Sequence, residues 1–190
     1  VQKDGGRRRL GPYREASWSP FGRFVVAARE NELAALEPDG KARWTLARRH
    51  VSSPRWTGSA TDTRIAYVAR AGIRVVPGDG TGDRLLSPGE RAPIAWRPGT
   101  RFVLGQLHGS ELRLQDADSG RVLRRARAGL AGDVLSLSWS PDGRRALVVH
   151  PWGVVLVDPD RDVARTVPFE ATDVVAAAFS PDGSQIAVLR

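Results

Sequence analysis

Short apolar stretches of five or six residues alternate with polar turn residues along the whole chain. In the clearest copy of this pattern, strands are expected at 134–139, 145–150, 154–158 and 163–167. The first two are joined by Ser140-Pro-Asp-Gly143, in which Pro presets φ, Asp bonds back to the turn backbone and Gly accepts positive φ. The pattern therefore predicts an antiparallel four-stranded meander, and the 3.6-residue period of a helix is missing.

The meander repeats, and each copy has an aromatic residue at the end of its first strand. The copies read Ala16-Ser-Trp-Ser-Pro-Phe-Gly22, Pro54-Arg-Trp-Thr-Gly58, Ile94-Ala-Trp-Arg-Pro-Gly99, Leu137-Ser-Trp-Ser-Pro-Asp-Gly143 and Ala177-Ala-Phe-Ser-Pro-Asp-Gly183. The aromatic residues are 38, 40, 43 and 40 positions apart. A period near 40 residues without helical periodicity is typical of β-propeller blades. One large ring per copy predicts packing between neighbouring sheets.

The Trp-Ser-Pro-Asp-Gly motif, followed by a basic residue and an apolar strand, resembles the repeat of TolB-type β-propellers, which are related in architecture to WD-repeat propellers. The resemblance covers the whole chain, although the copy at Trp56 is shorter and the copy at Trp96 lacks the Asp. The Gly-His and Trp-Asp signatures of WD repeats are missing. The resemblance implies an all-β propeller of four-stranded antiparallel blades.

Four whole blades and two half blades are expected. Their approximate bounds are 1–12 (outer half), 13–51, 52–91, 92–133, 134–171 and 172–190 (inner half). The two halves could pair to close a five-bladed ring, which would remove exposed sheet edges. Alternatively the chain is a piece of a larger propeller of six or seven blades. The second interpretation is slightly favoured, because both ends fall inside strand patterns.

Composition limits the possible chemistry. The chain has 29 basic and 21 acidic residues and a net charge of +8. Because arginine is spread through every repeat, the charge indicates solvated strand faces, and a nucleic-acid partner is not expected. No cysteine is present, which excludes thiol catalysis and thiolate metal sites. No apolar run approaches the roughly 20 residues of a membrane helix, so membrane attachment would need an anchor outside this chain.

Three local motifs imitate functional sites but lack essential parts. Gly78-Asp-Gly-Thr-Gly82 resembles a phosphate loop, yet a short strand follows it where a helix is required. Asp158, Asp160 and Asp162 imitate a calcium loop, but the Gly and Glu that the loop needs further on are missing. The three histidines come from different repeats. No metal or cofactor is expected, and no hydrolase or metalloprotease motif supports catalysis.

Binding is expected on the loops that vary between repeats, because a rigid scaffold usually presents its function on loops. These are the connections between second and third strands and between successive meanders. The candidate partner-binding residues are Trp152, Arg48, Arg49, His50, His108 and Tyr13. Trp152 is the strongest candidate, since an exposed tryptophan can anchor an interface, with packing over its own blade as the alternative. Tyr13, at the entry to a first strand, is expected near the central opening.

These features favour a non-catalytic scaffold that binds a protein or peptide. The resemblance implies an extracytoplasmic bacterial setting, periplasmic or at the cell envelope. One alternative is the propeller domain of a prolyl-oligopeptidase-like peptidase whose hydrolase domain lies outside this chain. A propeller enzyme such as a lactonase ranks last, because the first strands of the repeats offer almost no carboxylates for a central metal.

Overall fold

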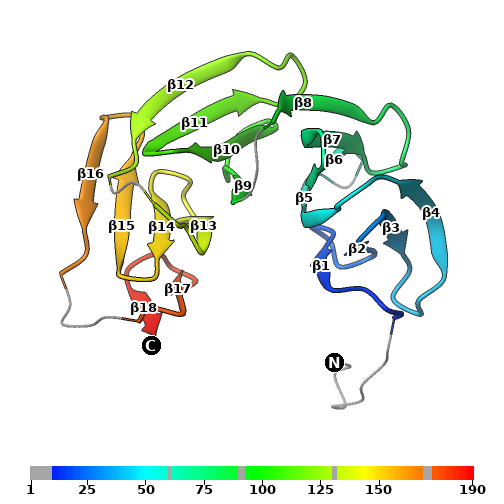
Figure 1. The fold of residues 1–190 in the computed structure, drawn as a ribbon, viewed down its shortest axis with the longest axis horizontal. Coiled ribbons are helices and arrows are strands. Elements are labelled where there is room, and N and C mark those ends of the chain that lie inside the picture. Colours follow the sequence, from blue (N-terminus) through cyan, green and yellow to red (C-terminus); the bar gives the residue numbers. More distant parts are fainter. Residues whose placement is uncertain (1–9, 60, 90–92, 130–131, 169–172) are drawn as a thin grey trace. The chain divides into compact units, whose positions relative to one another are not determined.

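The computed structural model describes residues 10–59, 61–89, 93–129, 132–168 and 173–190. Within them it contains eighteen β-strands and no helix, so the all-β class is confirmed. The strands form four antiparallel four-stranded sheets and one two-stranded sheet (Figure 1). The chain divides into two compact units, residues 1–90 and 91–190.

The first unit holds two meanders, in which sequential strands are neighbours. The first sheet consists of β1 (Glu15–Trp18), β2 (Val25–Arg29), β3 (Glu32–Leu36) and β4 (Ala42–Ala47). The second consists of β5 (Ser52–Gly58), β6 (Thr63–Ala69), β7 (Gly72–Pro77) and β8 (Arg84–Pro88). The expected strand at Arg7 to Leu10 lies outside the described residues, apart from Leu10, which is in no strand.

The second unit continues the same order. Its first sheet consists of β9 (Ile94–Trp96), β10 (Val103–His108), β11 (Glu111–Asp116) and β12 (Val122–Arg127). Its second consists of β13 (Ser136–Trp139), β14 (Ala146–His150), β15 (Gly153–Asp158) and β16 (Val163–Thr166). The two-stranded sheet consists of β17 (Ala176–Phe179) and β18 (Ile186–Leu189). The strands β13 to β16 begin and end within two residues of the expected bounds.

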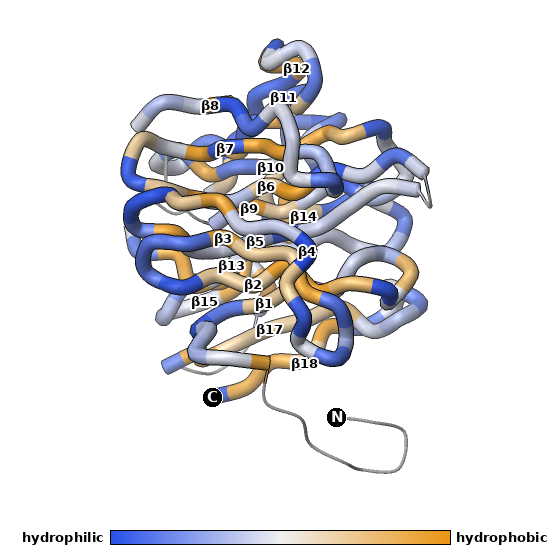
Figure 2. Tube along the Cα trace, turned by 90° about the vertical axis from the view of Figure 1, so that its right-hand side faces the viewer, coloured by the Kyte–Doolittle hydropathy of each residue, from blue (hydrophilic) through white to orange (hydrophobic). Residues whose placement is uncertain are grey.

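In each four-stranded sheet the fourth strand is more exposed than the two middle strands. All five residues of β14 (Ala146–His150) are buried, for example, whereas five of the six residues of β12 are exposed. Middle strands are covered on both faces and can be continuously apolar, while outer strands need polar side chains to protect an open edge. In Figure 2 the hydrophobic stretches accordingly follow the strands, and hydrophilic stretches concentrate in the turns.

In the second unit, the ring of Trp139 packs against the sheet that precedes its own. Its Nε1 donates a hydrogen bond to the carbonyl of Ala95 at 3.2 Å, and only 8% of the residue is exposed. Gly105 in β10 lies beneath the ring, because a Cβ built there would come within 3.0 Å of Trp139 Cζ2. The buried cluster around Trp139 includes Leu112 and Val155, from the two sheets that it joins.

Comparable contacts occur in two other repeats. In the first unit, the ring of Trp56 stacks on Phe24 with centroids 6.3 Å apart, and it packs against a buried cluster that includes Val26 and Ile65. In the second unit, Phe179 packs against the cluster that contains Leu147. The expected role of the repeated ring in packing between sheets is confirmed for these contacts.

Two of the repeated rings have different surroundings. Trp18 is 57% exposed, so the expectation that it is buried between sheets is wrong. It lies in the first sheet that the structure describes, and no described sheet precedes it to cover the ring. Trp96 is partly buried and makes an edge contact with Phe102 of its own sheet, with centroids 6.5 Å apart.

Replacing Trp139 with alanine should lower the free energy of unfolding by roughly 3 to 5 kcal/mol, the cost of a buried large-to-small change. Trp18→Ala removes the same side chain from the same Ser-Trp-Ser-Pro context, but it should change stability by less than about 1 kcal/mol because the ring is largely in solvent. Urea unfolding monitored by circular dichroism measures both. Equal losses of unfolding free energy in the two variants would contradict the packing of Trp139 between its own sheet and the preceding one.

Candidate binding surfaces

In the first unit, four of the predicted binding residues lie around the turn between β2 and β3. The Nδ1 atom of His50 is 2.7 Å from a carboxylate oxygen of Glu30 in that turn. The backbone N–H of Arg48 donates to the carbonyl of Asn31 at 3.1 Å. His50 has φ of +56°, a left-handed conformation that turns the chain from β4 into β5. The loop of Arg48 to His50 is therefore fixed against the neighbouring turn.

Tyr13 belongs to the same surface. Its hydroxyl donates to Glu32 at 3.5 Å, and the guanidinium of Arg29 lies 6.0 Å from the centre of its ring. Arg29 also forms an ion pair with Glu32 at 2.8 Å. Partial burial and the neighbouring Glu32 carboxylate raise the pKa of the Tyr13 hydroxyl, so it stays protonated and acts as a hydrogen-bond donor.

Arg48 is committed to a polar cluster centred on Asp83. The carboxylate accepts from Arg48 at 2.5 Å, from Arg74 at 2.7 Å and from the hydroxyl of Tyr67 at 2.7 Å. Only 4% of the Asp83 side chain is exposed. Burial alone would raise its pKa, but the hydrogen bonds from Arg74, Tyr67 and Arg48 outweigh burial and lower it. Burial and the Asp83 carboxylate raise the pKa of Tyr67. Arg48 is thus mainly a structural residue that joins the two sheets of this unit.

Arg49 is the basic residue of this loop that faces solvent. Its backbone carbonyl accepts from the N–H of Arg70 at 2.8 Å, while its side chain is exposed and has no ion pair among the described residues. Asn31, Ala47, Arg48 and Arg49 line a shallow hollow of about 460 Å³. The hollow combines a fixed backbone with one available guanidinium, an arrangement suited to a carboxylate or a peptide carbonyl.

The other two predicted residues lie in the second unit, at the turns between second and third strands. His108 ends β10 and is exposed. Trp152 is 47% exposed, and its ring stacks on His150 with centroids 5.4 Å apart. A Cβ at Gly132 would come within 2.8 Å of the same ring. Trp152 therefore packs over its own sheet with part of its ring and presents the rest to solvent.

Sequence reasoning missed the role of His150 as the support for Trp152. His150 is fully buried, and its Nδ1 lies 3.0 Å from the carbonyl of Asp133. The sequence contains a signal for this role. His150 is a polar ring in an otherwise apolar strand, and it lies two residues before the exposed Trp152. No group of three His, Cys, Asp or Glu residues that could hold a metal ion occurs in the part of the chain that the structure describes.

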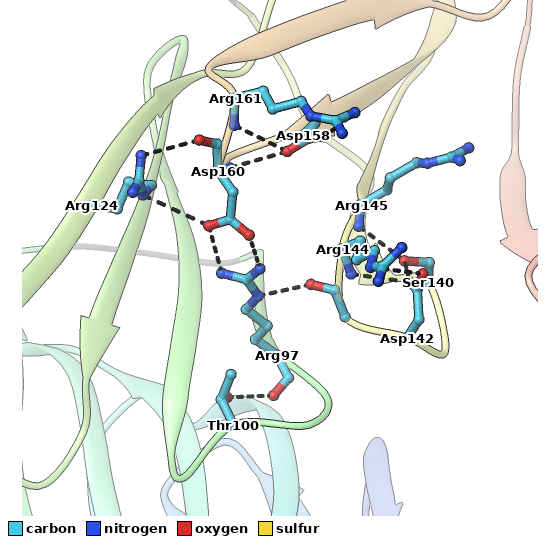
Figure 3. A network of polar contacts seen from close by, with 11 residues as sticks. Arg97, Thr100, Arg124, Ser140, Asp142, Arg144, Arg145, Asp158, Asp160 and Arg161 are labelled. Atoms are coloured by element: carbon cyan, nitrogen blue, oxygen red, sulfur yellow. Dashed lines mark hydrogen bonds and ion pairs between the residues drawn. The ribbon is translucent and has the colours of Figure 1, made fainter.

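The second unit also has a charged network that joins its first two sheets (Figure 3). Arg97 forms a paired contact with the carboxylate of Asp160, and its Nε donates to the carbonyl of Gly143 at 2.7 Å. Arg124 approaches Asp160 from the other side at 3.7 Å. The hydrogen bond from Arg97 lowers the pKa of Asp160, which favours the charged form of the carboxylate.

The aspartates that imitate a calcium loop have separate structural roles. Asp158 accepts from the backbone N–H groups of Asp160 and Arg161, each at 3.1 Å. Asp160 binds Arg97, and Asp162 accepts from the backbone N–H of Arg127 at 2.9 Å. The prediction of turn chemistry is therefore confirmed for Asp158, whereas Asp160 and Asp162 bind residues outside their own turn.

Beside this network lies a second hollow, which sequence reasoning missed because its residues are far apart in the chain. It measures about 340 Å³ and is lined by Arg144, Arg145, Asp158, Asp160 and Arg161. In Figure 3 the side chain of Arg145 points away from the Arg97–Asp160 pair. The two adjacent arginines, Arg144 and Arg145, were the signal for this hollow in the sequence.

The segment that imitates a phosphate loop is the turn between β7 and β8. Gly80 has φ of +83°, and a Cβ there would come within 2.6 Å of Trp44 Cδ2. The Nε1 of Trp44 donates to the carbonyl of Gly78 at 3.0 Å. The glycines therefore let the turn lie against an indole from the preceding sheet, and the prediction of a hairpin is confirmed.

Comparison with known proteins assigns no identity to the chain. No protein-family model matches the sequence, and no curated protein matches it. Among the described residues, no helix is long and apolar enough to cross a membrane.

Asp83→Asn tests the polar cluster. The substitution leaves two guanidinium groups without a counter-charge, and it should cost about 3 kcal/mol at pH 7. Because folding lowers the pKa of Asp83, its contribution is fully present above about pH 4 and is lost as pH falls through the lowered value. We therefore expect the difference in the free energy of unfolding between wild type and variant, measured by urea unfolding at pH 7, 5 and 3, to become smaller as the pH falls.

The exposed turn residue Asp39 provides the control, and Asp39→Asn should change stability by less than about 1 kcal/mol at every pH. If the free energies of unfolding of wild type and Asp83→Asn differ by the same amount at pH 7 and pH 3, the ionised carboxylate of Asp83 does not stabilise the cluster.

Proposed function

We propose that this chain is part of a β-propeller that acts as a non-catalytic scaffold and binds a protein or peptide through its variable loops. The observation that carries the proposal is Trp152, a large ring held on a rigid strand by His150 and still half exposed. A preorganised aromatic anchor loses little conformational freedom on binding, and such residues dominate interface energies.

The repeated meanders support a propeller arrangement. Each described four-stranded sheet has sequential strands as neighbours, and rings such as Trp139 and Phe179 rest on the preceding sheet. Propellers stack sheets of this kind around an axis and place the same class of loop at the same end of every blade. Under this proposal, the loops that carry His108 and Trp152, which both join second and third strands in the second unit, share one face.

The arrangement of charge favours a protein partner over nucleic acid. Many of the arginines are held in ion pairs, such as Arg48 and Arg74 with Asp83 and Arg113 with Glu111. Nucleic-acid surfaces instead present unpaired basic side chains to successive phosphates. An exposed guanidinium such as that of Arg49 is better suited to a peptide carbonyl or carboxylate.

Selection of a displayed random peptide library on the immobilised protein tests this proposal. We expect enriched peptides whose affinity, measured by fluorescence polarisation, falls at least about tenfold in Trp152→Ala, as for an interface hot spot. Trp18→Ala, which removes another half-exposed tryptophan, should leave the affinity unchanged. Trp152→Ala should also lose only about 1 kcal/mol of stability, the contribution of one ring stack.

Two results would contradict the proposal. One is the absence of enriched peptides, or peptides that bind Trp152→Ala as tightly as wild type. The other is cleavage of the peptides during incubation, seen by mass spectrometry, because a scaffold without catalytic groups leaves them intact.

A further inference from the structure

The second unit has a third hollow, where the chain leaves β12 and where it enters β16. It measures about 490 Å³ and is lined by Ser110, Arg127, Gly129, Asp162, Val163 and Ala164. These residues belong to two complete four-stranded sheets and their turns, and none of them lines the two hollows described above. The volume lies within the range of about 300 to 1,000 Å³ that is typical of small-molecule sites.

The backbone beside this hollow repeats that of the first unit. The N–H of Ala128, directly after β12, donates to the carbonyl of Ser110 at 2.7 Å. In the first unit the N–H of Arg48, directly after β4, donates in the same way to the carbonyl of Asn31 at 3.1 Å. Ala128 therefore occupies the position that Arg48 has in the first unit.

The strand pairing places Ala164 at the position of Asp83. Ala164 precedes the residue of β16 that lies opposite Leu156, and Asp83 precedes the residue of β8 that lies opposite Val75. Leu156 and Val75 are each the fourth residue of the third strand of their sheet. The two positions are therefore equivalent, although one holds a carboxylate and the other a methyl group.

This exchange of side chains explains the hollow. The ion pair of Arg48 with Asp83 joins the two sheets of the first unit. In the second unit Ala128 is buried in the apolar cluster between the sheets, and Ala164 packs against that cluster. Because two alanines take the place of a long arginine and an aspartate, a hollow remains between sheets that are otherwise held in the same way.

Two opposite charges line the hollow without forming an ion pair. The Oδ1 atom of Asp162 accepts from the backbone N–H of Arg127 at 2.9 Å, so the two residues are in contact. The guanidinium of Arg127 nevertheless pairs with no carboxylate among the described residues, and both residues are exposed. Charges that stay apart in this way can each bind a ligand group of the opposite sign.

Backbone geometry fixes the walls that carry these groups. Asp162 has φ of +54°, a left-handed conformation, and its bond to Arg127 leaves Oδ2 for a ligand. Gly129 has φ of +87°, and a Cβ there would come within 3.1 Å of Val155 Cγ1, so glycine lets this segment lie against β15. The hollow is therefore preformed, as small-molecule sites usually are.

We propose that this hollow binds a free α-amino acid with an aliphatic side chain. The α-carboxylate of the ligand accepts from the guanidinium of Arg127, and its α-ammonium donates to the Oδ2 atom of Asp162. The ligand side chain lies against Val163 and Ala164, which give the hollow its apolar side. The inference goes beyond the proposed peptide-binding function, since Trp152 does not line this hollow.

The opposite charges favour a zwitterion over other ligands. A simple anion would leave Asp162 without a partner, and a simple cation would leave Arg127 without one. An internal residue of a peptide has neither charge on its backbone, and each end of a peptide supplies only one. A free amino acid carries both charges on neighbouring atoms and satisfies the two side chains together.

The test titrates L-valine into the 190-residue chain labelled with ¹⁵N and follows the backbone amides by NMR. We expect saturable shifts centred on residues 127–129 and 162–164. N-acetyl-L-valine lacks the ammonium group, and L-valinamide lacks the carboxylate. Each should bind at least about tenfold more weakly than L-valine, because one charge-assisted hydrogen bond is lost.

Two variants each remove one charge. Asp162→Asn keeps an oxygen for the N–H of Arg127 and tolerates the left-handed conformation, so the backbone should be unchanged. It should bind L-valine at least about tenfold more weakly, yet bind N-acetyl-L-valine as wild type does. Arg127→Gln should likewise lose affinity for L-valine and keep that for L-valinamide. Asp39→Asn and Arg23→Gln, at exposed positions of the first unit, should bind L-valine like wild type.

Several results would overturn the inference. They are the absence of saturable shifts, equal binding of L-valine and N-acetyl-L-valine, and unchanged affinity for L-valine in Asp162→Asn. Tighter binding of glycyl-L-valine than of L-valine would also overturn it, because the charges of a dipeptide lie further apart than those of an amino acid. The peptide selection with Trp152→Ala is independent of all these results, so failure of the amino-acid site leaves the proposed function standing.

Discussion

The contact between a ring at the end of a first strand and the backbone of the preceding sheet is the interaction on which this structure depends. Each four-stranded meander is too thin to bury its own faces, so it is stable only against a neighbour. Trp139 shows how the contact is built, with its Nε1 on the Ala95 carbonyl and its ring over Gly105. Trp18 is exposed where no described sheet precedes it, which agrees with this dependence.

The same stacking determines which groups are available for binding. Residues that join neighbouring sheets, such as Arg48 with Asp83 and Arg97 with Asp160, are occupied by their partners. Groups that remain available, such as the side chain of Arg49 and part of the Trp152 ring, lie on the loops at the ends of the sheets.

Much of the fold could be predicted from the sequence, because period-2 apolar strands and Pro, Asp and Gly turns are local signals. The strands β13 to β16 follow directly from them. The polar cluster could not be predicted, since Asp83 and Arg48 are 35 positions apart and no local pattern links them. The loop positions of Trp152 and Arg49 were predicted, whereas the hollow that Arg145 and Arg161 line was missed because it depends on which strands lie side by side.

A double-mutant cycle between Gly105 and Trp139 tests the central contact most directly. In the wild-type background, Gly105→Ala places a methyl group against the indole and should destabilise the protein. In the Trp139→Ala background the indole is gone and only the Ala95 carbonyl oxygen, 3.3 Å from the added Cβ, remains close, so the substitution should cost much less. The account predicts a coupling free energy of about 1 to 3 kcal/mol from urea unfolding. Additive effects of the two substitutions would contradict it.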